Sequence, residues 1–191
     1  MAINTKKKAK KTPKTTKKTT KKVRKISSAR NAAELADFAL GQEKTLYPET
    51  YAPHVLEAFP NKNPGSEAWT TFVCTEFTSL CPKTNQPDFA RIFINYIADK
   101  TMVESKSLKL YLFSFRNHGD FHEDCVQKMC NDLFKLIKPK FIEVIGEFTP
   151  RGGIAIYPYS SQSSASHKKL KEHRQLNYAP GLYTMPLSRV Y

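Results

Sequence analysis

The sequence predicts an α+β domain in which a four-stranded antiparallel sheet carries two helices on one face. Four segments between residues 69 and 159 have the β-branched, aromatic or alternating composition of strands. Two segments in the middle repeat apolar residues at the i, i+3, i+4 and i+7 spacing of helices. The resulting β-β-α-α-β-β order lets each apolar face be buried against another layer. Such a sheet has two free edges, and joining the edges of neighbouring copies in a ring would remove them, so we expect oligomers.

The N-terminal thirty residues differ from the rest of the chain. Thirteen of the 31 Lys and Arg residues lie in residues 1–30, which contain no acidic residue. The remaining residues contain 18 basic and 17 acidic side chains and are therefore nearly neutral. The net charge of +14 therefore belongs to this tail. A Lys/Thr-rich segment buries too little apolar surface to offset its ordering entropy, so we expect disorder there. Residues 31–191 are expected to form a single domain.

Composition also limits the location and partners of the chain. No apolar run reaches the length of a membrane span, and four cysteines without a secretion signal predict the reducing cytoplasm. For the tail, a solubilising role is favoured, and contact with RNA or another polyanion is the alternative. A mitochondrial presequence is less favoured, because the tail is Lys-rich and lacks an apolar face.

The strands and the segments before them are predicted from composition. Ala32–Leu40 has the pattern of a short amphipathic helix or turn ended by Gly41, and the four prolines in residues 44–68 predict an irregular wrap over the core. Trp69–Leu80 predicts the first strand, and Phe89–Ala98 the second. One face of this second strand consists of Ala90, Ile92, Ile94 and Tyr96.

Two helices and two strands follow. Helical spacing begins after Glu104, breaks at Asn117–Asp120, and resumes until Pro139. The apolar positions of the first helix are Leu108, Tyr111, Leu112 and Phe115, and those of the second are Val126, Met129, Cys130, Leu133 and Ile137. Phe141–Phe148 predicts the third strand. Gly152–Tyr159 predicts the fourth, with Pro158 placing its end at an edge of the sheet.

A thiol and a carboxylic acid flank a rigid turn. Cys81 ends the first strand, and Asp88 follows seven positions later across a Pro-Lys-Thr-Asn turn. Held together, they could add to an unsaturated carbon and protonate its partner atom, and Lys83 would favour the thiolate. Packing for the cysteine and a strand start for the aspartate are the alternative roles. Cys74, Cys125 and Cys130 fit the packing role.

Three other motifs could bind ligands. Glu104–Lys109 starts a helix, where free N–H groups and two lysines suit a phosphate, although an ordinary cap is the more frequent role. His122-Glu123 could hold the edge of a purine-like ring, or Glu123 could simply complement the helix dipole. Arg151–Gly153 could grip a phosphate or form a hairpin turn. No Rossmann fingerprint is present, and no zinc site is expected, because the chain has no C-x-x-C pair.

In this order, the motifs resemble those of the NADPH-dependent 7-cyano-7-deazaguanine reductases of queuosine biosynthesis. The resemblance covers roughly residues 40–160 and is carried by Glu76–Pro82, Gln86–Ala90, Glu104–Tyr111, His122-Glu123 and Arg151–Gly153. The E-S-K-S-x-K-x-Y string separates this family from the related GTP cyclohydrolases. The resemblance implies the tunnelling fold, a single-module chain, and homo-oligomers made of one ring or two stacked rings.

The resemblance also implies roles for individual residues. Cys81 would attack the nitrile carbon to give a covalent thioimide, and Asp88 would protonate the nitrile nitrogen. The substrate, 7-cyano-7-deazaguanine, would be held by Val103, Glu104, Ser105, His122 and Glu123. NADPH would be contacted by Ser105, Lys106, Lys109, Arg151 and Gly152. Two hydride transfers would give the primary amine, 7-aminomethyl-7-deazaguanine.

Three alternatives stay open at this point. The chain could be a GTP cyclohydrolase-like enzyme of the same fold, or an RNA-binding module that uses its basic tail. Separately, Cys125 lies two positions after Glu123, so an oxidised Cys81–Cys125 bridge could protect the nucleophile reversibly. Simple packing of Cys125 is an equal alternative to that bridge.

Overall fold

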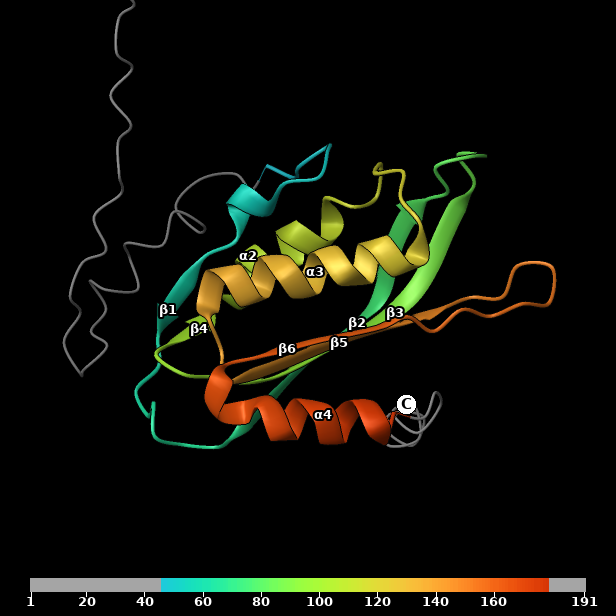
Figure 1. The fold of residues 1–191 in the computed structure, drawn as a ribbon. Helices are drawn as coiled ribbons and strands as arrows, with labels where there is room; N and C mark the ends of the chain where they lie inside the picture. The colour runs from blue at the N-terminus through green and yellow to red at the C-terminus, as the bar shows by residue number, and fades with distance from the viewer. Residues whose placement is uncertain (1–45, 179–191) are drawn as a thin grey trace, which may run out of the picture.

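The computed structural model describes residues 46–178, so the basic tail and the helix or turn predicted at Ala32–Leu40 lie outside the described residues. The main sheet has four antiparallel strands in the order β2-β3-β5-β6. They are β2 (Trp69–Leu80), β3 (Pro87–Ile97), β5 (Phe141–Phe148) and β6 (Tyr159–Ser163). Helices α2 (Ser105–Phe113) and α3 (His122–Ile137) lie together on one face of the sheet (Figure 1). The predicted α+β class and layer arrangement are confirmed.

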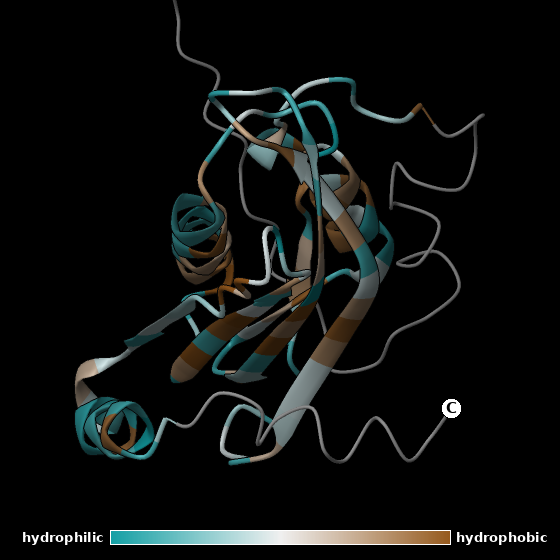
Figure 2. Cartoon of the chain, turned by 90° about the vertical axis from the view of Figure 1, so that its right-hand side faces the viewer, coloured by the Kyte–Doolittle hydropathy of each residue, from teal (hydrophilic) through white to brown (hydrophobic). Residues whose placement is uncertain are grey.

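The central strand β3 organises the core. It pairs with β2 from Trp69↔Ile97 to Leu80↔Pro87, with an irregularity between Cys74 and Phe77. On its other side it pairs with β5. Its predicted inner face is fully buried against the helices, and Figure 2 shows apolar residues on the strands and on the sheet-facing side of α3.

Both predicted helices present their apolar positions to the core, and every residue of the two predicted stripes is buried. α3 ends at Ile137, and its C-cap Lys138 adopts the left-handed conformation with φ 43° directly before Pro139. Helix and sheet approach closely at Gly146 on β5. A Cβ added there would lie 2.8 Å from Cγ2 of Val126, so this position requires glycine.

The fourth strand lies further along the chain than predicted. Gly152 and Gly153 take φ values of 59° and 83°, and Arg151 and Ile154 exchange backbone hydrogen bonds of 3.0 and 3.1 Å across them. This is a hairpin turn, because positive φ at both central residues matches the twist of the flanking chains. The returning arm stays beside β5 through a bond from Gly146 N–H to the Pro158 carbonyl, but the regular strand begins only at Tyr159. β6 is polar, and its composition therefore gave no strand signal.

The segment before β2 is more regular than the predicted wrap. It contains the 3-10 turn η1 (Pro53–Val55) and the short strand β1 (Ala58–Pro60). β1 pairs antiparallel with β4 (Thr101–Val103), which leads directly into α2. This second, two-stranded sheet fixes the start of α2.

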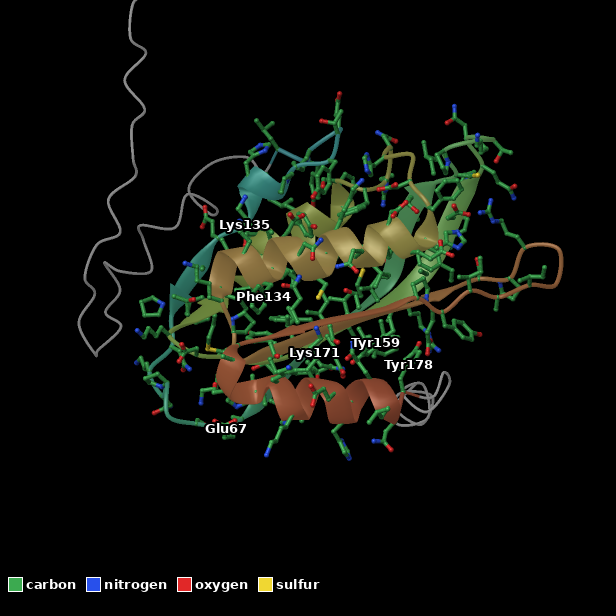
Figure 3. The ribbon with its side chains drawn as sticks, in the orientation of Figure 1. Glu67, Phe134, Lys135, Tyr159, Lys171 and Tyr178 are labelled. Atoms are coloured by element: carbon green, nitrogen blue, oxygen red, sulfur yellow. The ribbon has the colours of Figure 1, made fainter. Side chains whose placement is uncertain are left out.

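A helix that was not predicted, α4 (Lys168–Leu176), follows the short 3-10 turn η2 (Ala165–His167) and lies on the sheet face opposite to α2 and α3 (Figure 1). A buried carboxylate anchors it. Glu143 is fully buried and receives hydrogen bonds of 2.6 and 3.1 Å from Arg174, 2.9 Å from Asn95 and 3.1 Å from Tyr159. The Tyr159 and Tyr178 rings also meet, with centroids 4.4 Å apart (Figure 3). A buried charge is tolerated only when it is paired in this way.

None of the helices within residues 46–178 combines the length and apolarity that crossing a bilayer requires.

Candidate active site

Cys81 lies directly after β2 in a loop that closes on itself. Its N–H donates to the Gln86 carbonyl and its own carbonyl accepts from Asn85 N–H, both at 2.9 Å. Asn85 takes φ 55°, a left-handed conformation that asparagine tolerates well. The loop turns the backbone N–H groups of Lys83 and Thr84 towards the Cys81 sulfur.

Hydrogen bonding in this loop lowers the pKa of the Cys81 thiol to about 7. The Thr84 hydroxyl has the largest influence, the N–H groups of Lys83 and Thr84 follow, and the Arg151 guanidinium adds to them, while burial acts in the opposite direction. Lys83 therefore favours the Cys81 thiolate, as predicted. It does so through its backbone N–H rather than through its side-chain ammonium. Cys81 is 9% exposed and is a free thiol.

The other cysteines are poor nucleophiles. Burial raises the pKa of Cys125 to about 12 and that of Cys130 to about 11, and it also raises the pKa of Cys74. All four are free thiols in the structure, and the Cys81–Cys125 bridge stays a prediction. If it forms, Cys81 must be the activated partner, because only its thiolate is populated near neutral pH.

Asp88 lies on β3 with its side chain 2% exposed, and a nitrogen atom lies near each of its two oxygens. Arg151 Nη2 lies 3.0 Å from Oδ1, and His122 Nε2 lies 3.1 Å from Oδ2 without the alignment of a hydrogen bond. Arg151 Nη2 is also 3.3 Å from His122 Nε2. Because Arg151 also reaches Cys81, one guanidinium lies among the thiol, the carboxylate and the imidazole.

His122 is held as a rigid, buried ring. It stacks on Phe148 with centroids 3.9 Å apart and an interplanar angle of 10°. Its Nδ1 is buried and has no hydrogen-bond partner among residues 46–178. A buried polar atom of this kind is costly unless a ligand or water satisfies it. The predicted neighbour Glu123 is exposed at the same helix start.

A cavity of about 120 Å³ lies at this point. It is lined by Pro82, Asp88, Asp120, Phe121, His122, Glu123, Arg151 and Ile156. The structure therefore brings together five predicted site residues: Cys81, Asp88, His122, Glu123 and Arg151. Gly152 adjoins them in the hairpin turn, and a Cβ added there would meet no atom within 4 Å. Position 152 therefore requires glycine for its positive φ in the turn, not to leave room for a neighbouring atom of the same chain.

The remaining predicted residues form a second group at the start of α2. Val103 is buried in β4. The Glu104 carboxylate caps its own helix, accepting from Lys106 N–H at 2.8 Å and from Ser107 N–H at 2.6 Å. Two N–H groups expected to receive a phosphate are therefore already occupied by Glu104. The Lys109 side chain is exposed and lies over the ring of Tyr47.

Ser105 and Lys109 line a groove of about 550 Å³ between α2 and β2. Arg116, which was not predicted, lines the same groove and lies 4.2 Å from the centroid of the Phe113 ring. Its sequence signal is only a basic residue three positions after an aromatic one. A hydroxyl and two cations along a groove of this size suit the phosphates of a dinucleotide.

The two groups are far apart within one chain. Thr101 Oγ1 on β4 donates to the carbonyl of Ile137, the last residue of α3, at 2.8 Å. His122 is the first residue of the same helix, which has 16 residues. At a rise of 1.5 Å per residue, the 15 steps from His122 to Ile137 span roughly 23 Å, so β4, which leads into α2, contacts the end of α3 opposite to His122.

Replacing Thr84 by valine is expected to raise the pKa of Cys81, because the thiolate loses its strongest hydrogen-bond donor. Below the pKa the thiol is protonated and unreactive, so alkylation by iodoacetamide should slow mainly under mildly acidic conditions. We expect a decrease of roughly threefold to tenfold there, because the thiolate loses one donor but keeps the backbone N–H groups of Lys83 and Thr84. The pH profile of Cys81 alkylation measures the shift, with Thr75→Val as the matched control. An unchanged profile would contradict this role.

A cysteine with a near-neutral pKa, beside a carboxylate, a guanidinium and an imidazole, is an arrangement typical of enzymes that work through a cysteine nucleophile. A family model described as QueF-like protein matches residues 87–167. Curated relatives named NADPH-dependent 7-cyano-7-deazaguanine reductase match most of the chain. That of Bdellovibrio bacteriovorus is 73% identical over 166 residues, which are 86% of this chain and 98% of the relative. Those of Bacteroides thetaiotaomicron and Neisseria meningitidis are 61% and 59% identical over 148 and 153 residues, which in each case are 76% of this chain and 98% of the relative.

This chain belongs to the family of NADPH-dependent 7-cyano-7-deazaguanine reductases, and the resemblance seen in its motifs is confirmed. A solved structure of apo archaeosine synthase QueF-Like aligns with 52% of this chain and 98% of that chain, at a TM-score of 0.48 and 15% identity.

Proposed function

We propose that this chain reduces the nitrile of 7-cyano-7-deazaguanine to a primary amine with NADPH, in queuosine biosynthesis, through a thioimide on Cys81. Family membership supports the overall reaction and favours it over a GTP cyclohydrolase-like activity. The observation that carries the mechanism is the Cys81 thiol, with its pKa of about 7 and its neighbours Asp88 and Arg151.

The first step joins the substrate to the protein. The Cys81 thiolate attacks the nitrile carbon and forms a C–S bond, while one π bond of the nitrile breaks towards nitrogen. Asp88 gives that nitrogen a proton, which leaves a thioimide and an ionised Asp88. Glu123 and the free Nδ1 of His122 offer polar partners to the ring of the substrate.

Asp88 needs an open oxygen to act as the acid. In the structure Oδ1 faces the guanidinium of Arg151 and Oδ2 faces Nε2 of His122. Oδ2 has no hydrogen-bond partner among residues 46–178, so it can carry the proton while Oδ1 keeps its contact with Arg151. We therefore expect Asp88 to give its proton to the nitrile nitrogen from Oδ2.

NADPH, when bound, supplies the two hydrides, so that one nitrile, two NADPH and two protons give one amine and two NADP⁺. The groove residues Ser105, Lys109 and Arg116 fit a dinucleotide through their hydroxyl and cationic groups. Lys106, Arg151 and Gly152 remain proposed contacts from the family resemblance. The protein contributes the nucleophile, the proton and the positioning of both reactants.

We further propose that a neighbouring copy completes the site in a ring of the tunnelling-fold type. The predicted substrate-binding residues are split between the start of α3 and the segment from β4 into α2, and β4 contacts the opposite end of α3. Strand β2 is a long sheet edge whose Trp69 and Val73 are 47% and 38% exposed, and a second copy could cover it. Sedimentation velocity should give a multiple of the chain mass of 21.8 kDa, and a monomer would contradict the proposal.

The reaction is tested by following NADPH absorbance after addition of 7-cyano-7-deazaguanine. Two NADPH should be consumed for each nitrile, and mass spectrometry should identify the primary amine. A preparation without the nitrile measures background oxidation. Absence of NADPH consumption by the oligomeric protein would overturn the proposed function.

A further inference from the structure

A short loop before α3 holds the chain on both sides of Cys81. The N–H of Leu80 donates to the His118 carbonyl at 3.0 Å, and the Leu80 carbonyl accepts from Asp120 N–H at 3.1 Å. A Cβ added to Gly119 would lie 3.5 Å from Cα of Pro82. Residues 118–120 therefore bracket the nucleophile through the residue before it and the residue after it.

Side chains of the same loop are tied to α3. Asp120 Oδ2 pairs with Lys128 Nζ, and both lie 3.3 Å from His118 Nε2. The Asp120 and His118 side chains are mostly buried, and that of Lys128 is partly exposed. A pair held in a partly buried, three-member network is less screened than a surface ion pair.

The network packs against a partly buried group of polar and aromatic side chains. The ring of Tyr51 stacks on His118 with centroids 5.1 Å apart, and Lys128 Nζ lies 5.7 Å from the Tyr51 ring centroid. The Tyr51 hydroxyl donates to Asp132, which also accepts from the buried Tyr111 at 2.6 Å. These contacts limit the freedom of His118 and Lys128 to rearrange.

The loop also leads into the other side of the site. Asp120 lines the cavity that contains Asp88, and Phe121 is the N-cap of α3, directly before His122. The distance between the nucleophile and the ring-holding start of α3 therefore depends on where residues 118–120 lie.

We propose that His118, Asp120 and Lys128 are positioning residues that fix the position of Cys81 relative to the start of α3. His118 and Lys128 do not line the cavity, and the loop that they hold acts on Cys81 through the backbone of Leu80. The kinetic part of this inference rests on the proposed function, whereas the clamp itself does not.

The test compares Lys128→Met with the parent in two measurements. Adduct formation with 7-cyano-7-deazaguanine, without NADPH, should slow by roughly tenfold or more, because small displacements of a reacting group cost up to about 100-fold. Hydrogen exchange at the amides of Leu80 and Asp120 should accelerate, while the Asn85 amide, which bonds within the Cys81 loop, should keep its rate. General destabilisation of the protein would accelerate hydrogen exchange at all three amides.

Three further variants make the test specific. Lys128→Arg should restore adduct formation, and Lys135→Met on the same helix, where Lys135 is exposed, should have no effect (Figure 3). The double variant Asp120→Asn with Lys128→Met should slow adduct formation no more than Lys128→Met alone, because the two residues act as one pair. The proposal is overturned if the Leu80 amide keeps the parent rate in Lys128→Met, or if Lys135→Met slows the adduct equally. A parent that forms no adduct would instead contradict the proposed function and leave the exchange test intact.

Discussion

Replacing Cys81 by alanine is expected to abolish the covalent adduct with 7-cyano-7-deazaguanine and to lower turnover by a factor of roughly 10³ or more, as loss of a nucleophile does in other enzymes. No other cysteine can substitute, because burial raises the pKa of Cys74, Cys125 and Cys130. In the parent protein, adduct formation should rise with pH through about 7, as the Cys81 thiol ionises.

Intact mass of the protein incubated with the nitrile, but without NADPH, measures the adduct. Cys74→Ala is the matched control, since Cys74 lies on β2, the strand directly before Cys81, and burial raises the pKa of its thiol. An adduct that persists in Cys81→Ala, or that maps to another residue, would contradict the mechanism.

Replacing Asp88 by asparagine is expected to slow adduct formation by roughly 10²- to 10⁴-fold, the usual range for a general acid. Asparagine has nearly the same shape and can still accept a hydrogen bond from Arg151, but it has no acidic proton to transfer to the nitrile nitrogen. The Cys81 thiol keeps its loop donors Thr84 and Lys83, so its alkylation by iodoacetamide should change only a few-fold.

The ratio of these two rates separates the acid from a residue that merely supports the thiolate. If alkylation and adduct formation fall together, Asp88 acts on the nucleophile and not on the nitrile nitrogen. Asp99→Asn, in the turn after β3, serves as the control for the loss of one negative charge.

Much of the fold follows from local patterns. The bounds of Trp69–Leu80 and Phe141–Phe148 match the prediction, because strands that pair on a buried sheet need β-branched and apolar residues along their length. The apolar positions of both helices were also predictable from the sequence, since one buried helical face imposes a 3.6-residue period. The polar strand β6 and the basic helix α4 had no such pattern. They are held by side chains from elsewhere in the chain, above all by the buried Glu143, which receives Arg174 from 31 positions away.

The same division applies to the site. The sequence by itself determined the thiol–acid pair at Cys81 and Asp88, because a strand end, a rigid turn and a strand start are local features. Only the tertiary structure decided that Arg151 lies between them, that Glu104 caps its own helix, and that the α2 residues lie at the far end of α3. Such contacts join segments dozens of positions apart, and they depend on sheet register and helix placement rather than on any local pattern.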